Sequence, residues 1–427
     1  MQFFRTLLRD SLLKNAFYLM ATNLTNLLLG FIFWVIAAIY YSPDEIGTIS
    51  AVLSSMFLIA MISSLGFTTS LIFYLPRDRK NASKMINSCI IASIAVSVLF
   101  SSIYILGIDI WTPALGSIFG NLESDIIFMA VTIFSTISSL ISSAFTAGKR
   151  SSFHMTKETV FGSLKILPLP LLAGFGAMGI FLSWGVGLLL SLILSLVLLS
   201  IVWKGYLPRL TLDPIIKSMA GYSAWNYLAD LFYSLPRFVL PILIVNLISP
   251  ESTGFFFIAF MVAGLLYGIP QSITNSLLAE TSDGGKLWDK VGRAIRFNAA
   301  LVIPGFLLFV FFGKFVLNLF NPNYAQNAST TLTILAAASL PLSINTIFMG
   351  IRNSQKKVKS VVKINLAISV ITFVLVVPFI KVWGLNGAAA AYFVANVVCA
   401  IAVIYWMSNP AEFISNQFKY NRKEGSG

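Results

Sequence analysis

Apolar stretches of about 20 residues or more, long enough to cross a lipid bilayer, recur from end to end of this 427-residue sequence. Short polar segments separate them, so the recurrence predicts a series of transmembrane helices. The twelve predicted helices cover residues 15–40, 45–72, 85–106, 125–148, 157–175, 179–203, 217–247, 253–278, 294–317, 330–350, 360–380 and 384–406. The first stretch is long and uninterrupted, which favours a helix of the mature protein over a cleaved signal peptide. The expected fold class is all-α integral membrane.

Basic residues alternate from one inter-helix segment to the next. Of the 29 Lys and Arg residues, 25 lie on one side of the predicted membrane, around residues 5–14, 77–84, 149–157, 204–217, 286–296, 352–363 and 419–423. The segments on the other side contribute only Lys314 and Lys381. By the positive-inside rule, both termini are expected in the cytoplasm and the chain in the plasma (inner) membrane. The net charge of +13 therefore reflects topology, with anionic membrane lipids rather than nucleic acid as the expected partner.

The two halves of the sequence share short motifs at nearly constant spacing. Ser42-Pro-Asp-Glu-Ile-Gly47 matches Ser249-Pro-Glu-Ser-Thr-Gly254 at an offset of 207 residues, and Gly176-Ala-Met-Gly179 matches Gly384-Leu-Asn-Gly387 at an offset of 208. A third match, at an offset of 202, places Gly148, Arg150 and Lys157 on Gly350, Arg352 and Lys359. Three matches in near register indicate duplication of a six-helix unit.

Duplication of an even number of helices predicts two lobes of the same orientation, related by a pseudo-two-fold axis along the membrane normal. The expected lobes are residues 1–208 and 209–418, six helices each, followed by a cytoplasmic tail at 419–427. Its last three residues, Gly425-Ser426-Gly427, resemble an artificial linker. Membrane proteins of this design bind a substrate at the interface of the repeats and open alternately to the two sides. The repeat therefore indicates transport.

The residues that carry a family resemblance are Ser42-Pro-Asp-Glu-Ile-Gly47, Ser64-Leu-Gly66, Gly148-Lys-Arg150, Gly254-Phe-Phe, Gly268-Ile-Pro-Gln-Ser-Ile273 and Trp383-Gly-Leu-Asn-Gly-Ala-Ala-Ala-Ala391. Over nearly its whole length the chain resembles polysaccharide and oligosaccharide-lipid flippases, the O-antigen and capsule type, of the multidrug/oligosaccharidyl-lipid/polysaccharide exporter (MOP) superfamily. The resemblance implies that a polyprenyl-phosphate- or diphosphate-linked oligosaccharide moves from the cytoplasmic to the outer leaflet. The expected partners are this substrate, membrane lipids, a coupling cation (H⁺ or Na⁺) and other polysaccharide-assembly proteins, with no cofactor and no metal.

Two other functions compete with this interpretation. An ion-coupled multidrug antiporter of the same superfamily often places a coupling carboxylate in its first helix, but residues 15–40 contain no Asp or Glu. A membrane enzyme, such as a polysaccharide polymerase, would need catalytic side chains and usually a sizeable outer loop. The longest outer loop, at 107–122, has no Lys, Arg or His, so an enzyme is not expected.

Charged side chains at the centre of a membrane are costly, so they tend to face a cavity and to mark function. In the predicted helix at 217–247 the residues Asn226, Asp230, Tyr233 and Arg237, spaced by 4, 3 and 4, form one stripe. Asp230 and Arg237 either form a structural pair or contact the substrate or a gate, and Asp230 is also a candidate for ion coupling. Both alternatives stay open at this point.

Around the predicted helix at 157–175, His154, Glu158 and Lys165 lie within an arc of about 40°. His154 and Glu158 are either solvated groups at the membrane interface or coupling and gating groups, whereas the central Lys165 is expected to bind substrate. With Arg237 it would make a locally positive cavity suited to phosphate. Neutral amides on two further helices, namely Asn23, Asn26, Gln271 and Asn275, are candidates for binding sugar hydroxyls or for ordinary interhelical bonds.

Overall fold

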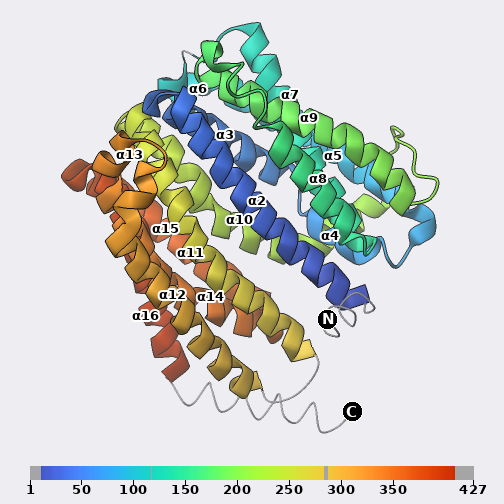
Figure 1. Cartoon of the computed structure of the whole chain (residues 1–427). Coiled ribbons are helices and arrows are strands. Elements are labelled where there is room, and N and C mark those ends of the chain that lie inside the picture. The colour runs from blue at the N-terminus through green and yellow to red at the C-terminus, as the bar shows by residue number, and fades with distance from the viewer. Residues whose placement is uncertain (1–10, 117, 283–286, 409–427) are drawn as a thin grey trace, which may run out of the picture. The chain divides into compact units, whose positions relative to one another are not determined.

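All elements of the described chain are helical. The computed structural model describes residues 11–116, 118–282 and 287–408, and within these ranges there are α-helices and short 3₁₀ helices but no strand. Figure 1 labels these helices along the chain. The predicted tail at 419–427 lies outside the described residues. The all-α class expected from the sequence is confirmed.

Eleven of the described helices are long and apolar enough to cross a membrane. They are α2 (Ser11–Tyr40), α3 (Pro43–Ser63), α5 (Ala82–Leu106), α7 (Leu122–Ala147), α9 (Ala177–Val202), α10 (Ile215–Leu247), α11 (Pro250–Ser282), α12 (Leu287–Asn318), α14 (Ser329–Ser354), α15 (Val358–Trp383) and α16 (Leu385–Ser408). The short elements between them are α4 (Phe67–Tyr74), η1 (Arg79–Asn81), α6 (Ile108–Trp111), η2 (Pro113–Leu115), α8 (Ser151–Leu164), η3 (Ala173–Phe175) and α13 (Pro322–Asn327). The chain is therefore a multi-pass membrane protein.

The predicted helix at 157–175 is continuous only in its first half. Helix α8 ends at Leu164, and the chain continues through hydrogen-bonded turns to η3. Pro168 and Pro170 cause this change, because each lacks a backbone N–H and disfavours the α conformation of the residue before it. The expectation of one regular helix here was wrong beyond Leu164.

The predicted helix at 45–72 is also divided, at the Ser64-Leu-Gly66 motif. Leu65 (φ 50°) and Gly66 (φ 73°) both adopt left-handed backbone conformations, which end α3 and start α4. Helix α10 packs against this break, where the Ser223 hydroxyl donates to the Gly66 carbonyl at 2.8 Å. A Cβ atom on Gly66 would lie 2.9 Å from the Cβ of Tyr227. The break thus fixes the position of α10 beside α3 and α4.

The repeated glycine motifs adopt the same backbone structure. Gly176 (φ 56°, ψ −143°) and Gly384 (φ 54°, ψ −134°) make the turns that precede α9 and α16. Three residues later, a Cβ atom on Gly179 would lie 2.1 Å from the Leu172 carbonyl oxygen, and one on Gly387 2.1 Å from the Phe379 carbonyl oxygen. Equal turns and equal close approaches at matched positions support the duplication inferred from the sequence.

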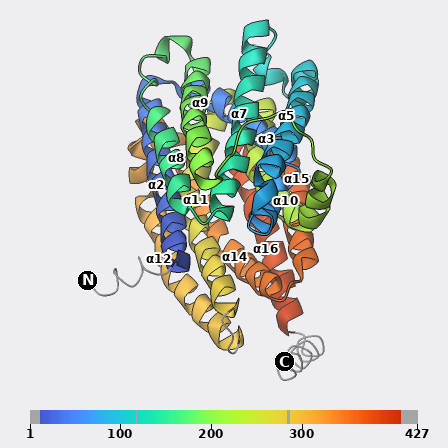
Figure 2. The ribbon, with the colours of Figure 1, turned by 90° about the vertical axis from the view of Figure 1, so that its right-hand side faces the viewer.

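The described helices group into two compact units. Unit 1 comprises Met1–Ile258 and Phe315–Ala328, and unit 2 comprises Ala259–Lys314 and Ser329–Gly427. In unit 1, α9 packs on α7 and α8; in unit 2, α16 packs on α14 and α15, which Figure 2 shows from the side. The same packing pattern therefore follows the repeat in each unit. The predicted lobe boundary at residue 208 stays a prediction.

Within unit 1 the two serine-proline motifs pack against each other. Ser42 and Ser249 cap their helices in the same way, each accepting a hydrogen bond from the backbone N–H three residues on. A Cβ atom on Gly47 would lie 1.7 Å from the Pro250 carbonyl oxygen, and one on Gly254 would lie 2.2 Å from the Pro43 carbonyl oxygen. Only glycine at both positions allows the starts of α3 and α11 to come this close.

Candidate functional site

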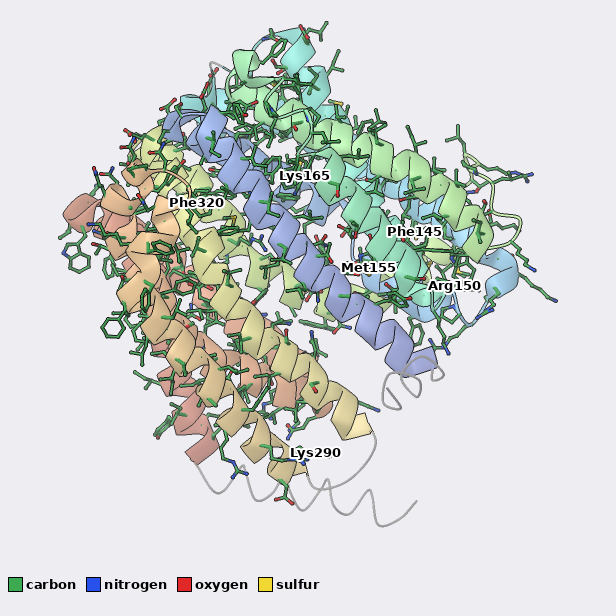
Figure 3. The ribbon with its side chains drawn as sticks, viewed as in Figure 1. Phe145, Arg150, Met155, Lys165, Lys290 and Phe320 are labelled. Atoms are coloured by element: carbon green, nitrogen blue, oxygen red, sulfur yellow. The ribbon has the colours of Figure 1, made fainter. Side chains whose placement is uncertain are left out.

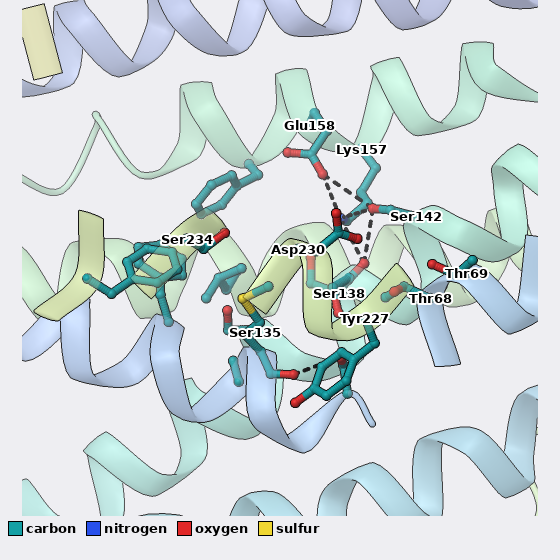
Figure 4. Close-up of a pocket in the computed structure, with 18 of the residues that line it drawn as sticks. Thr68, Thr69, Ser135, Ser138, Ser142, Lys157, Glu158, Tyr227, Asp230 and Ser234 are labelled. Carbon is teal, nitrogen blue, oxygen red and sulfur yellow. Dashed lines mark hydrogen bonds and ion pairs between the residues drawn. The ribbon is translucent and has the colours of Figure 1, made fainter. Parts of the chain in front are cut away.

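A cavity of about 440 Å³ lies within unit 1 and is lined by residues of α3, α4, α7, α8, α9 and α10 (Figure 4). Its polar residues are mostly hydroxyls, together with Lys157, Glu158 and Asp230. Aromatic side chains, among them Phe57 and Trp184, line the rest of it. The cavity therefore combines hydrogen-bonding and apolar surfaces inside a membrane-spanning unit, which is typical of a ligand site.

The strongest polar interactions at this cavity link α7 to α8. The Lys157 ammonium donates to Glu158 Oε1 at 2.7 Å, to Ser142 Oγ at 2.7 Å and to the Ser138 carbonyl oxygen at 3.1 Å. Dashed lines in Figure 4 mark this network. Because an ammonium has three donors, Lys157 is fully satisfied in this arrangement and ties the two helices together.

Lys157 was not among the site residues predicted from the sequence, because it is the last of several basic residues in a segment predicted to be cytoplasmic. The structure instead begins α8 at Ser151, so Lys157 lies almost two turns inside the helix and its side chain is 2% exposed. The signal available in the sequence was the directly following Glu158, which provides the opposite charge. The equivalent Lys359 in the second half has no acidic neighbour in the sequence.

Serines on α7 form one wall of the cavity. Ser135, Ser138, Ser139 and Ser142 all line it and follow helical spacing along a single face. Four hydroxyls on one stripe of a membrane helix provide donors and acceptors without charge. This stripe was visible in the sequence but was not among the predicted site residues.

Helix α10 contributes Tyr227, Asp230, Ser234 and Phe238 to the lining. This face overlaps the predicted stripe only at Asp230. The other predicted members, Asn226, Tyr233 and Arg237, are not among the lining residues, and the Tyr233 side chain is 42% exposed. The structure thus places Asp230 at the cavity. The expected substrate contacts of Asn226, Tyr233 and Arg237 stay predictions.

Lys165 lies behind the aromatic wall of the cavity. Its ammonium nitrogen is 4.0 Å from the centre of the Trp184 ring, 4.7 Å from that of Phe161 and 4.9 Å from that of Phe33. Figure 3 labels Lys165 just beyond the end of α8. Trp184 and Phe161 line the cavity, whereas Lys165 does not and is 5% exposed. Cation–π contacts with three rings compensate in part for burying this charge.

The charge of the cavity differs from the expected one. Its described lining carries one cation, Lys157, and two acids, Glu158 and Asp230, whereas the sequence predicted a locally positive site built on Lys165 and Arg237. Hydroxyls and carboxylates accept hydrogen bonds from sugar hydroxyls. The lining therefore suits a neutral polyol better than a phosphate.

Other predicted residues are placed as follows. Asn26 donates to Glu158 Oε2 at 3.3 Å, and His154 Nε2 lies 3.7 Å from Glu158 Oε1, so both join the α8 network. Asn23 is exposed on α2. Gln271 and Asn275 are exposed one turn apart on α11, in unit 2. Within the described residues no group of His, Cys, Asp and Glu is arranged to hold a metal ion.

Comparisons with known proteins place the chain in a family. The polysaccharide biosynthesis protein family matches residues 12–281, more than half of the sequence. No curated protein sequence matches the chain. Among solved structures, an inward-closed lipid II flippase MurJ is 15% identical with a TM-score of 0.74, covering 92% of this chain and 88% of its own.

Two further structural matches are transporters. An inward-facing multidrug resistance transporter of the MATE family, in the MOP superfamily, is 16% identical with a TM-score of 0.71 and covers 90% of this chain and 93% of its own. A MOP transporter from Pyrococcus furiosus with a binding pocket of reverse polarity is 13% identical, with a TM-score of 0.61 and coverage of 92% and 94%. At these identities the likeness shows the fold.

The described helices thus have the fold of these MOP-superfamily transporters. Within that class, the chain belongs to the polysaccharide biosynthesis protein family.

Proposed function

We propose that this protein is a flippase, rather than an enzyme, that moves a polyprenyl-phosphate- or diphosphate-linked oligosaccharide from the cytoplasmic to the outer leaflet of the inner membrane. The observation that carries the proposal is the polar cavity of about 440 Å³ in unit 1 of a chain from a polysaccharide biosynthesis family. The serine wall of α7 and the carboxylate of Asp230 bind hydroxyls of the glycan. The basic segments lie in the cytoplasm, as do both termini.

Export of this substrate needs little coupling energy. Two negative charges moving outward through an inside-negative potential gain about 4.6 kcal/mol per 100 mV. Asp230 is the candidate for binding a coupling cation, H⁺ or Na⁺, because its carboxylate lines the cavity from α10. It therefore assists export without being indispensable to it.

The test is flipping in proteoliposomes of a short-chain prenyl-diphosphate trisaccharide that carries a fluorophore quenched only from outside. We expect the wild type to expose this probe and Ser135→Val, in the cavity, to slow it. The matched control is Ser200→Val, because Ser200 is exposed and bonds only within its own helix, at 2.7 Å to Val197 O. Asp230→Asn reduces the rate without abolishing it.

The same vesicles separate the flippase from an ion-coupled multidrug antiporter. Transport of ethidium driven by a pH gradient, complete loss of it in Asp230→Asn, and no movement of the glycolipid would contradict the proposal. If Ser135→Val flips the glycolipid at the wild-type rate, the serines of α7 do not bind the glycan.

A further inference from the structure

Unit 2 contains a second cavity, of about 310 Å³, between α12, α14 and α16. Its lining is almost wholly apolar, with Asn298 and Ser343 as the only polar members among the described lining residues. Three of its isoleucines, namely Ile295, Ile303 and Ile344, are also partly open on the surface at 46%, 49% and 38% exposure. An open, apolar cavity in a membrane-spanning unit is suited to a hydrocarbon chain.

The length of this cavity matches one membrane leaflet. On α14 it is lined by Leu340, Ile344, Ile347 and Ile351, spaced by 4, 3 and 4 along one face. At about 1.5 Å per residue this stripe extends about 16 Å, close to half of a hydrocarbon core of about 30 Å. The stripe leads from the middle of α14 to its end beside the basic segment that follows.

A buried cation lies at that end of the cavity. The Arg352 guanidinium carbon is 3.6 Å from the centre of the Trp406 ring and 5.1 Å from that of Phe348, and Phe348 itself lines the cavity. Arg352 is 7% exposed. On α12, Arg293 and Arg296 lie on either side of the lining residue Ile295 in the sequence and are exposed. One end of a leaflet-long apolar cavity is therefore positively charged.

The matched helix of unit 1 has the opposite character. Helix α14 corresponds to α7 in the repeat, because Gly148, which directly follows α7, matches Gly350 near the end of α14. Where α7 presents Ser135, Ser138 and Ser142 to a polar cavity, α14 presents mainly leucine and isoleucine. The two matched helices thus line cavities of different polarity.

We propose that the unit 2 cavity binds the prenyl chain of the carrier lipid, with the lipid phosphate beside Arg352. The charge at one end favours an anionic headgroup, and the apolar length fits a chain lying in a single leaflet. This inference rests on the proposed function, since it assigns the carrier lipid of that substrate. It gives the glycan and the hydrocarbon chain separate cavities.

The test uses farnesyl phosphate with a diazirine at its far end, added to the protein in phosphatidylcholine nanodiscs and photolysed. Peptide mapping should find the label on residues 295–303 and 340–351. Unlabelled undecaprenyl phosphate should displace the probe, while inorganic phosphate and phosphatidylglycerol should not. Arg352→Gln should lower the apparent affinity about tenfold, as expected for one lost charge-assisted hydrogen bond.

Ile344→Trp fills the cavity and should abolish labelling. Val374→Trp is the matched control, because Val374 is 67% exposed on α15 and outside the cavity lining. Equal displacement by phosphatidylglycerol would identify a resident lipid site and overturn the proposal, as would unchanged labelling of Ile344→Trp. The competition experiment uses the wild-type protein, so its result does not depend on whether a variant folds.

The probe carries no sugar, so the outcome is independent of the glycan. Farnesyl phosphate labelling with no flipping of the glycolipid would refute the proposed function and leave a prenyl phosphate site. Flipping without labelling of this cavity would refute the site and leave the function.

Discussion

Buried Lys157 pairs with the partly exposed Glu158, and removing either partner should be costly. Lys157 is 2% exposed and its ammonium lies 2.7 Å from Glu158 Oε1. An uncompensated buried charge costs about 3–5 kcal/mol, whereas apolar replacement of both partners is often tolerated. We expect Lys157→Met and Glu158→Gln to lower the melting temperature of the detergent-solubilised protein, and the double variant to recover part of the loss. Purely additive effects in the double-mutant cycle would contradict a direct pair.

At Lys165, two substitutions separate the effect of the charge from the effect of the side-chain volume. Lys165→Met keeps a long side chain among Phe33, Phe161 and Trp184, so the melting temperature should change little, while Lys165→Ala leaves a void costing about 2–5 kcal/mol. The sequence-based expectation that Lys165 and Arg237 bind the substrate phosphate, in place of Arg352, predicts that Lys165→Met and Arg237→Ala both reduce glycolipid export at normal protein levels. Lys381→Ala is the control. Full export by the double variant of Lys165 and Arg237 would return both residues to structural roles.

The sequence identified Asp230 as a candidate site residue. It did not identify which face of α10 lines the cavity. Tyr227, Asp230, Ser234 and Phe238 obey helical periodicity as well as Asn226, Asp230, Tyr233 and Arg237 do, and both stripes contain the acid. Periodicity alone gives no direction for the cavity. The deciding feature is the contact of α10 with Gly66, which is a tertiary interaction.

The close contact between the starts of α3 and α11 depends on two glycines. Gly47→Ala would place a methyl group 1.7 Å from the Pro250 carbonyl oxygen, so the two helices must separate. We expect a clear fall in the melting temperature for Gly47→Ala and Gly254→Ala. Gly30→Ala in α2 is the control, because nothing lies within 4 Å of its added Cβ. It should be neutral or stabilising by about 0.5–1 kcal/mol from helix propensity.

Unchanged stability in Gly47→Ala would show that α3 and α11 do not hold this contact in the dominant state of the protein. The double alanine variant gives a second measurement. Since both methyl groups act on one interface, its loss should be less than the sum of the single losses.

The lengths of the apolar stretches predicted which helices form. They did not predict where a helix is interrupted. The eleven long helices correspond to eleven of the twelve predicted stretches. Hydropathy averages over a window and cannot register a local change at Leu65 and Gly66 or at Pro168 and Pro170. The prolines and the glycine motif were recognised in the sequence, yet only the structure shows that each interrupts a helix.

At the scale of the molecule, duplication explains both the symmetry and the asymmetry of the chain. Matched glycines keep the same turns before α9 and α16, because their backbone conformations exclude other side chains. Lining positions carry no such constraint, so serines occupy α7 where apolar residues occupy α14. A repeat detected from glycines therefore predicts the fold of each unit but not the ligand of either cavity.

The loop charges predict the orientation of the whole chain, and this prediction is open to a direct test. Cysteines placed at Trp111 and Asn323 should react with a membrane-impermeant maleimide in intact cells. Those at Asn81 and Ser354 should react only after permeabilisation, because their basic segments are predicted to be cytoplasmic. The two native thiols do not interfere, since Cys89 is 0% exposed and Cys399 6%. Trp111 is 54% exposed and Asn323 is also exposed, so access is governed by the membrane. If instead Asn81 and Ser354 are labelled in intact cells and Trp111 and Asn323 are not, the predicted topology is wrong. The proposed direction of export would then be reversed as well.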